Sequence, residues 1–377
     1  MLKVIADDNI PFLKGILEPY AFIEYLPASL ITRETIKNAD ALLVRTRTKC
    51  DASLLDGTTV KFIATATIGF DHIDTEYCRS KNIHWVNAPG CNSSAVQQYW
   101  LSAILTLAEK NHFDLGKMTL GIIGAGNVGK KVERAARLFG MKVLLNDPPR
   151  ARKEGSEGFV NLDWILESSD IISIHVPLNR GGEDNTFHLF DSNLLGKMKS
   201  GAWLINTARG EAVESEALKK NLSEGKLSGV ILDVWENEPD IDPELLRNVF
   251  ISTPHIAGYS LDGKANGTMM IVNSFYNFFG LPAGFTLPKL PPPFSPVILS
   301  KAENISCQEI VRQAVIHAYP IMDDHNTLHK APSSFEQLRG SYPFRREFPA
   351  YIVKINNGSK EVIEILEGLG FSVENKL

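Results

Sequence analysis

The stretch at 118–140, M-T-L-G-I-I-G-A-G-N-V-G-K-K-V-E-R-A-A-R-L-F-G, decides the fold of this 377-residue chain. An apolar run enters three glycines spaced as G-x-G-x-x-G, which are Gly124, Gly126 and Gly129, and an amphipathic segment follows. In such a loop the glycines allow a tight turn, a close approach of a pyrophosphate and the packing of helix on strand. The stretch therefore predicts a dinucleotide-binding βαβ unit, and a purely structural glycine turn is the less favoured alternative.

An acidic residue follows this loop at the distance that the fold requires. Asp147 ends the next apolar run, 18 positions after Gly129. A carboxylate at that place accepts hydrogen bonds from the ribose hydroxyls and repels a 2′-phosphate. We therefore expect NAD rather than NADP as the cofactor, although Arg150 close by weakens this preference.

Apolar runs alternate with helical stretches on both sides of the motif, which is typical of parallel sheets covered by helices. The runs at 119–123, 142–146, 171–175, 202–206, 229–234 and 249–252 predict the six strands of a Rossmann NAD-binding domain. An earlier series predicts strands at 2–6, 41–44, 62–66 and 83–86 and helices at 11–18 and 31–38. This series indicates a second, flavodoxin-like α/β domain.

Two long helices are expected at 93–110 and 262–279, and a Pro-rich segment follows at 287–296. We infer a substrate (lid) domain made of 1–98 and 256–286, with the Rossmann domain at 99–255 inserted between its two pieces. Residues 287–377 form a third, α+β domain, with helices at 306–318 and 359–368 and strands at 350–355 and 370–373.

Composition excludes several classes of protein. With 44% hydrophobic and 22% charged residues, the chain can bury a full core, and a net charge of -5 gives no electrostatic case for nucleic acid or an anionic membrane. No apolar run reaches the length of a membrane span, and the N-terminus is not a secretion signal. The four scattered cysteines indicate reduced thiols, so we expect a cytoplasmic protein without a metal or disulfide framework.

Polar side chains follow the ends of the predicted strands. Arg209, in N-T-A-R-G, comes directly after a buried strand, where a guanidinium can hold a carboxylate bidentately. An arginine paired only at the surface is the alternative. Val176, in H-V-P-L, ends another strand, and a cofactor wall and a simple strand end remain equally open.

The last two motifs supply a carboxylate and an imidazole. D-V-W-E-N-E-P at 233–239 offers Asp233, Glu236 and Glu238, and T-P-H-I-A-G at 253–258 fixes His255 just past a strand. A carboxylate beside an imidazole fixes its tautomer and raises its pKa. We expect His255 to act as a general base beside Glu238 and Arg209, and a hydrogen-bonded turn histidine is the alternative.

Together the four motifs resemble the D-isomer-specific 2-hydroxyacid dehydrogenases over residues 1–286. The resemblance implies that Arg209, Glu238 and His255 are catalytic and that Asp233 contacts the nicotinamide amide. The implied cofactor-binding residues are Gly124, Gly126, Asn127, Val128, Gly129, Asp147, Val176, Thr207, Ala208, Asp233 and Gly258. Val176 departs from the family pattern, which has a hydroxyl residue there.

Further stretches narrow the resemblance to the family members that oxidise 4-phospho-D-erythronate to 2-oxo-3-hydroxy-4-phosphobutanoate in vitamin B6 biosynthesis. They are R-T-R-T-K at 45–49, T-A-T-I-G-F-D-H-I-D at 65–74, N-A-P-G-C-N at 87–92, H-I-A-G-Y-S-L-D-G-K at 255–264 and F-E-Q-L-R-G-S-Y-P-F-R-R-E at 335–347. This implies a phosphorylated sugar acid as substrate, substrate contacts from Thr46, Thr67 and Tyr259, and a homodimer formed through the C-terminal domain.

The substrate phosphate needs a cationic partner, for which the candidates are Arg45, Arg47, Lys264, Arg345 and Arg346. Our hypothesis is that Arg345 or Arg346 reaches the phosphate, and dimer salt bridges are the alternative role. Two other functions stay open: another D-2-hydroxyacid dehydrogenase, such as 3-phosphoglycerate dehydrogenase, or a non-catalytic NAD-sensing protein.

Overall fold

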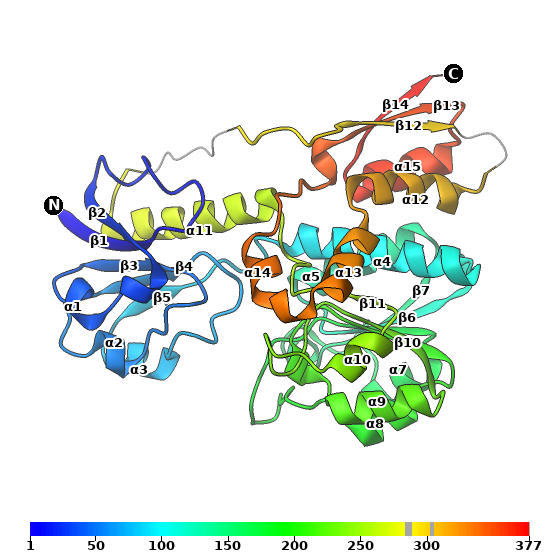
Figure 1. Ribbon diagram of the computed structural model, residues 1–377, viewed down its shortest axis with the longest axis horizontal. Coiled ribbons are helices and arrows are strands. Elements are labelled where there is room, and N and C mark those ends of the chain that lie inside the picture. Colours follow the sequence, from blue (N-terminus) through cyan, green and yellow to red (C-terminus); the bar gives the residue numbers. More distant parts are fainter. Residues whose placement is uncertain (283–288, 302–304, 377) are drawn as a thin grey trace. The chain divides into compact units, whose positions relative to one another are not determined.

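The computed structural model describes residues 1–282, 289–301 and 305–376, and Figure 1 labels its helices and strands. Two compact units form, each from two segments of the chain. The first contains Met1–Asn92 and Ser260–Pro291, and the second contains Ser93–Tyr259 and Pro292–Leu377. The division into three domains stays a prediction, and its boundary at 286/287 falls outside the described residues.

The first unit holds a five-stranded parallel sheet in the order β2-β1-β3-β4-β5. Its strands are β1 (Leu2–Asp7), β2 (Ala21–Leu26), β3 (Ala41–Val44), β4 (Phe62–Thr65) and β5 (His84–Val86). One face packs on α11 (Leu261–Phe279), and the other packs on α1 (Arg33–Ile36), α2 (Ala52–Leu55) and α3 (Thr75–Ser80) (Figure 1). Because helices cover both faces, every residue of β3 and β4 is buried.

The predicted strands and long helix of this unit match β1, β3, β4, β5 and α11, but the helix predicted at 11–18 is wrong. That segment consists of turns. Phe12 has a φ of 61° and Gly15 a φ of 88°, which both lie outside the right-handed helical region. The edge strand β2, which follows these turns, is missed by the sequence prediction.

The second unit is centred on a six-stranded parallel sheet in the order β11-β10-β9-β8-β6-β7. The six predicted runs correspond to β6 (Thr119–Ile123), β7 (Lys142–Asn146), β8 (Ile171–Ile174), β9 (Ala202–Asn206), β10 (Leu227–Leu232) and β11 (Ile251–Ser252). The chain places β7 on one side of β6 and β8 on the other. In doubly wound folds, ligands bind outside the carboxyl ends of the strands at such a reversal.

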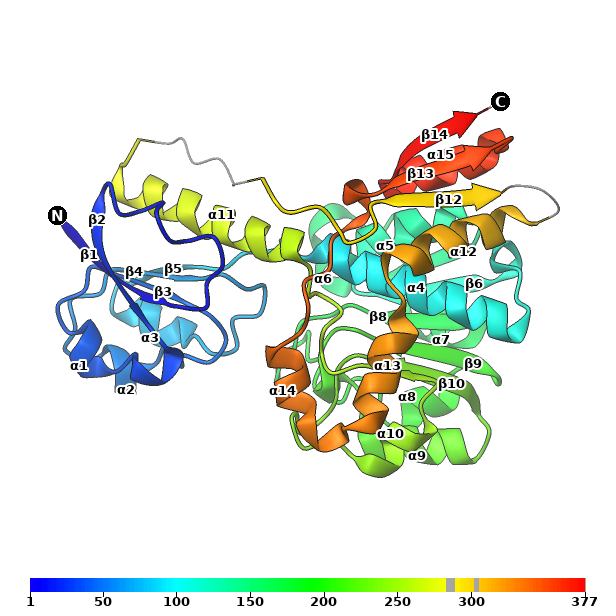
Figure 2. The same cartoon turned by 45° about the horizontal axis from the view of Figure 1, so that its top comes forward.

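Helices cover both faces of this sheet (Figure 2). On one face lie α4 (Ser93–Asn111) and α5 (Asn127–Leu138), whose apolar residues share a core with Ile122, Ile205 and Ile231. The other face packs on α7 (Leu162–Ser168), α8 (Ser192–Lys197), α9 (Ser215–Ser223) and α10 (Pro243–Asn248). The short helix α6 (Pro148–Glu154) follows β7. Because side chains alternate along each strand, the two faces of the sheet contribute to two separate apolar clusters.

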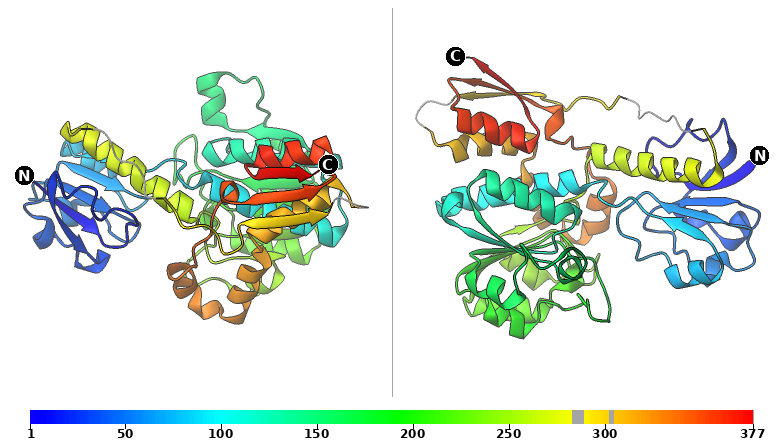
Figure 3. Two further views of the ribbon diagram at one scale, coloured as in Figure 1. Left: turned by 90° about the horizontal axis from the view of Figure 1, so that it is seen from above. Right: turned by 180° about the vertical axis from the view of Figure 1, so that it is seen from behind.

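The C-terminal part of the second unit is a small parallel sheet in the order β12-β13-β14, with strands β12 (Val297–Lys301), β13 (Ile352–Asn356) and β14 (Ser372–Lys376). The helices α12 (Cys307–Ala318) and α15 (Lys360–Leu369) cover one face and also pack on α4 and α5 (Figure 3). The sequence prediction misses β12 and the helices α13 (Ile321–Lys330) and α14 (Phe335–Gly340), which lead back toward the larger sheet. Among the described helices, none is both long and apolar enough to span a bilayer.

Candidate active site

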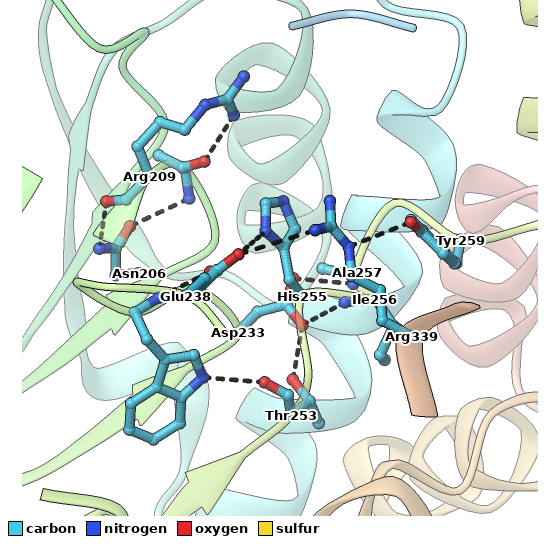
Figure 4. Close-up of polar contacts among 12 residues, drawn as sticks. Asn206, Arg209, Asp233, Glu238, Thr253, His255, Ile256, Ala257, Tyr259 and Arg339 are labelled. Carbon is cyan, nitrogen blue, oxygen red and sulfur yellow. Dashed lines mark hydrogen bonds and ion pairs between the residues drawn. The ribbon is translucent and has the colours of Figure 1, made fainter. Parts of the chain in front are cut away.

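An imidazole and a carboxylate meet at the carboxyl edge of the larger sheet. Nδ1 of His255 lies 2.7 Å from Oε2 of Glu238, and Oε1 of Glu238 accepts the backbone N–H of Trp235 at 2.9 Å (Figure 4). Because the carboxylate occupies Nδ1, the ring proton belongs there and Nε2 keeps its lone pair. Nε2 makes no hydrogen bond to any other residue that the structure describes. The pair can therefore accept a proton at Nε2.

The environment of Glu238 keeps its carboxyl ionised. Burial alone raises the pKa of Glu238, but the hydrogen bonds from His255 and Trp235 and the positive charge of Arg339 outweigh burial and hold the pKa below its ordinary value. The third carboxylate of the same motif, Glu236, instead bonds to His188 Nε2 at 2.6 Å and to the Ser215 N–H at 2.7 Å. Of the two glutamates that the sequence offers, Glu238 is thus the one that joins His255.

Asp233 fixes the loop that carries His255. Its side chain is only 1% exposed, and its Oδ1 accepts the Thr253 hydroxyl at 2.6 Å and the Ile256 N–H at 2.8 Å. Oδ2 accepts the Ala257 N–H at 2.9 Å. These bonds hold His255 at a φ of 56°, in a region that is costly for residues other than glycine. The nicotinamide contact of Asp233 stays a prediction, and the loop contacts are a role that sequence reasoning does not find.

Arg209 lies on the turn after β9. Its Nη1 donates to the carbonyl of Ala208 at 2.8 Å, and Asn206 holds the turn by donating to the Arg209 carbonyl at 2.9 Å. The next residue, Gly210, packs directly on the loop after β10, because an added Cβ would lie 1.9 Å from the backbone carbon of Trp235. This close approach brings the Arg209 turn to the loop that carries Glu238. Figure 4 shows Arg209 and Glu238 on neighbouring loops around His255.

The glycine loop fits a bound dinucleotide. Gly124 has a φ of 90°, and an added Cβ would meet the His175 carbonyl at 2.7 Å; at Gly129 it would meet the Gly124 carbonyl at 2.1 Å. At Gly126, by contrast, an added Cβ meets nothing within 4 Å. Gly124 and Gly129 are therefore needed for packing, whereas Gly126 leaves open space beside the start of α5, where a pyrophosphate would bind. Asn127 and Val128 form the first turn of that helix.

Asp147 follows β7 as predicted and caps α6. Its Oδ2 accepts the Ala125 N–H at 2.9 Å, and its Oδ1 accepts the Arg150 N–H at 3.1 Å, so each oxygen retains lone-pair capacity for a ribose hydroxyl. The Arg150 guanidinium bonds to both carboxylate oxygens of Glu154, at 3.0 and 2.6 Å. Arg150 is thus neutralised within α6, which leaves the preference for NAD to Asp147.

The loop after β8 lies beside the glycine loop, where the cofactor is predicted to bind. The backbone nitrogen of Val176 would lie 3.0 Å from a Cβ added at Gly124, so Val176 borders the glycine loop, and its side chain is half-buried. His175, which sequence reasoning leaves unassigned, contacts Thr207 Oγ1 at 3.3 Å and Ser173 Oγ at 2.9 Å. Burial lowers the pKa of His175 to about 3, so its ring is neutral. Thr207, with Ala208, therefore lies beside Val176 and the glycine loop; their cofactor contacts stay predictions, as does that of Gly258.

Sequence reasoning also misses Arg339 on α14. Its Nε donates to Tyr259 Oη at 3.2 Å, and its Nη1 lies 3.9 Å from Glu238 Oε2 (Figure 4). The signal is present in the sequence, since Arg339 belongs to the quoted stretch F-E-Q-L-R-G. Arg345, one of the two residues proposed instead, is 7% exposed and donates to the Ala257 carbonyl at 2.7 Å, and the role of Arg346 stays a prediction. Arg345 thus stabilises the loop that carries His255 by a hydrogen bond to its backbone.

Thr46 and Thr67 lie in the first unit, just after the ends of β3 and β4. Thr46 is exposed, and Thr67 is half-buried. The Thr67 hydroxyl lies 2.7 Å from the Thr65 hydroxyl and donates to the Gly69 carbonyl at 3.0 Å. Both threonines lie on the carboxyl edge of their own sheet, and their substrate contacts stay predictions.

Comparison with known proteins agrees with this geometry. Residues 87–257 match the family model described as D-isomer specific 2-hydroxyacid dehydrogenase, NAD binding domain. A D-lactate dehydrogenase from Aquifex aeolicus, solved with NAD and lactic acid, is 28% identical with a TM-score of 0.61, covering 74% of this chain and 95% of that one. An NAD⁺-bound 3-phosphoglycerate dehydrogenase from Entamoeba histolytica is 28% identical with a TM-score of 0.64, covering 74% and 95%.

Relatives that match nearly the whole chain are closer in sequence. The erythronate-4-phosphate dehydrogenase of Bacteroides thetaiotaomicron is 48% identical over 93% of this chain and 98% of its own length. Those of Porphyromonas gingivalis and Proteus mirabilis are 40% and 38% identical, over 98% and 100% of this chain and 100% of each relative. The chain therefore belongs to the D-isomer specific 2-hydroxyacid dehydrogenase family, and its full-length relatives are named erythronate-4-phosphate dehydrogenases. The predicted family, fold class and NAD-binding domain are confirmed.

Proposed function

We propose that the chain catalyses the NAD-dependent oxidation of 4-phospho-D-erythronate to 2-oxo-3-hydroxy-4-phosphobutanoate, a step of vitamin B6 biosynthesis. The names of the full-length relatives support the substrate. The observation that carries the chemistry is the 2.7 Å contact between His255 Nδ1 and Glu238, which leaves Nε2 as a base at the carboxyl edge of the sheet.

In this proposal His255 Nε2 takes the proton of the C2 hydroxyl, and the Glu238 carboxylate stabilises the imidazolium that forms. Arg209 binds the C1 carboxylate and orients C2 toward the base. NAD, when bound at the glycine loop with Asp147 on its ribose, supplies the acceptor for the hydride from C2. A positioned base of this kind contributes about 10²–10⁴-fold to the rate.

A specific observation also favours a second candidate substrate, because the NAD⁺-bound structural neighbour is a 3-phosphoglycerate dehydrogenase. Steady-state kcat/KM for 4-phospho-D-erythronate, 3-phosphoglycerate and D-lactate with NAD separates these candidates. We expect a preference of about 10³-fold for 4-phospho-D-erythronate, because 3-phosphoglycerate lacks one hydroxyl-bearing carbon and D-lactate lacks the phosphate, and sites built for a polar group reject analogues that lack it. Equal or higher kcat/KM for 3-phosphoglycerate would reassign the substrate and leave the chemistry unchanged.

We further propose that the chain forms a homodimer through the small C-terminal sheet. Because α12 and α15 cover one face of this sheet, the alternate residues of β12 point away from them. Ile298 is 3% exposed, whereas its neighbour Leu299 is 80% exposed, and Phe294 just before the strand is fully exposed. Exposed apolar side chains of this kind, on or just before the edge strand β12, are what an interface between two copies would bury.

A further inference from the structure

Arg339 is held rigidly beside the His255–Glu238 pair. The helix α14 is anchored by Phe335, which is 1% exposed and belongs to the apolar core beneath the larger sheet. Arg339 follows Phe335 by four positions and so leaves the helix on the same side. Its Nε is fixed by the Tyr259 hydroxyl, and its side chain is 22% exposed. The side chain is thus held in place and remains partly exposed.

The residues that the structure describes use little of the hydrogen-bonding capacity of Arg339. A guanidinium carries five N–H donors, and only the one on Nε of Arg339 is donated to Tyr259. The distance of 3.9 Å from Nη1 to Glu238 is too long for a hydrogen bond. Within the described residues, Nη1 and Nη2 make no hydrogen bond. Glu238 already accepts hydrogen bonds from His255 and Trp235, so Arg339 supports that carboxylate by its charge and not by a hydrogen bond.

The free edge of such a guanidinium matches a tetrahedral oxyanion, which accepts two parallel N–H bonds. The neighbouring Tyr259 hydroxyl adds a further polar group at the same place. Figure 4 shows Arg209 and Arg339 on opposite sides of the His255 ring. A substrate with an anion at each end, whose reacting carbon lies next to one of them, would bridge this arrangement.

We propose that Arg339, with Tyr259, binds the phosphate of the substrate and thereby selects phosphorylated over unphosphorylated 2-hydroxy acids; this rests on the function proposed above. Arg209 then binds the carboxylate at C1, and His255 takes the proton of the C2 hydroxyl between the two anions. Arg345 is excluded from this role because its side chain is buried against the Ala257 carbonyl and the ring of Tyr319. The residue that recognises the phosphate therefore comes from the C-terminal part of the chain.

The test compares Arg339→Gln with the wild type on 4-phospho-D-erythronate and on D-erythronate, which lacks the phosphate. We expect kcat/KM for the phosphorylated acid to fall by about 10²–10³-fold, mainly through KM, with less than about a three-fold change for D-erythronate. Arg339→Lys keeps the positive charge but lacks the paired N–H donors of a guanidinium, so it should show an intermediate loss of kcat/KM. Arg137→Gln, which removes an exposed arginine at the end of α5, is the matched control and should behave as the wild type.

An equal loss of kcat/KM on both acids in Arg339→Gln would overturn the phosphate assignment, because it would mean that Arg339 acts through the His255–Glu238 pair. Unchanged kinetics on both would overturn it as well. Thermal unfolding and NADH binding of each variant show that the fold is intact, and Arg339→Lys carries the test if Arg339→Gln does not fold. Failure of the wild type to oxidise 4-phospho-D-erythronate is a separate outcome, which would overturn the proposed function itself.

Discussion

Oδ1 of Asp233 lies 2.8 Å from the backbone nitrogen of Ile256, the residue that follows His255. One buried carboxylate thus ties the end of β10 to the loop after β11. In Asp233→Asn, an amide N–H would face one of the backbone donors that the carboxylate now satisfies. We expect kcat to fall about 10-fold or more, with a loss of about 1–3 kcal/mol in the free energy of unfolding. Steady-state kinetics and denaturant unfolding measure the two effects; an unchanged kcat would contradict the positioning role.

The glycine loop allows a prediction that separates folding from cofactor binding. Gly126→Ala adds a Cβ where nothing lies within 4 Å, so we expect the Tm to be kept while the Kd for NADH rises at least about 10-fold. Gly129→Ala puts a Cβ 2.1 Å from the Gly124 carbonyl and should cost about 1–3 kcal/mol or more of stability. Fluorescence titration with NADH and thermal unfolding test the pair. The reverse pattern, with Gly126→Ala the less stable protein, would refute the assignment of the open space.

Much of the fold follows from local pattern. Most strands of the larger sheet are short apolar runs buried on both faces, with the edge strand β7 the main exception, so periodicity and length are sufficient to find them. The motifs then fall at strand ends, and parallel strands bring those ends to one edge. For this reason the approach of Glu238 to His255, separated by 17 residues in the chain, is predictable from sequence and is present at 2.7 Å.

What sequence reasoning misses depends on contacts between distant segments. The hydrogen bond from Arg339 to Tyr259 spans 80 residues, and it exists because Phe335 anchors a six-residue helix on a core that no local pattern reveals. The turns at 11–18 have helical spacing of apolar residues, yet Phe12 and Gly15 adopt positive φ values. Leu13 and Leu17 are nevertheless fully buried, so packing in the folded chain overrides the local periodicity there.

The proposed dimer predicts that a charge on the open face of the C-terminal sheet separates the subunits. Leu299→Glu places a carboxylate at a side chain that is 80% exposed in the single chain, so it should leave the Tm of the monomer fold nearly unchanged. We expect the wild type to have twice the mass of one chain in light scattering and Leu299→Glu to have the mass of one. Phe22→Glu, at an apolar residue 59% exposed on β2, is the matched control and should keep the mass of the wild type. A dimeric Leu299→Glu would exclude this face as the interface.

The Glu238–His255 contact predicts a specific effect of acid. Because the pKa of Glu238 is lower in the folded protein than its ordinary value of 4.5, ionised Glu238 contributes stability above that value, and this contribution is lost as pH falls through the folded pKa. Glu238→Gln has no such carboxylate. We therefore expect the stability difference between wild type and Glu238→Gln to shrink as the pH falls below about 4.5. At neutral pH, kcat of Glu238→Gln should be lower by about 10²-fold, since the amide no longer stabilises the imidazolium. Unfolding curves at several pH values for both proteins measure the difference, and a gap that stays constant down to the lowest pH would show that Glu238 carries no depressed pKa.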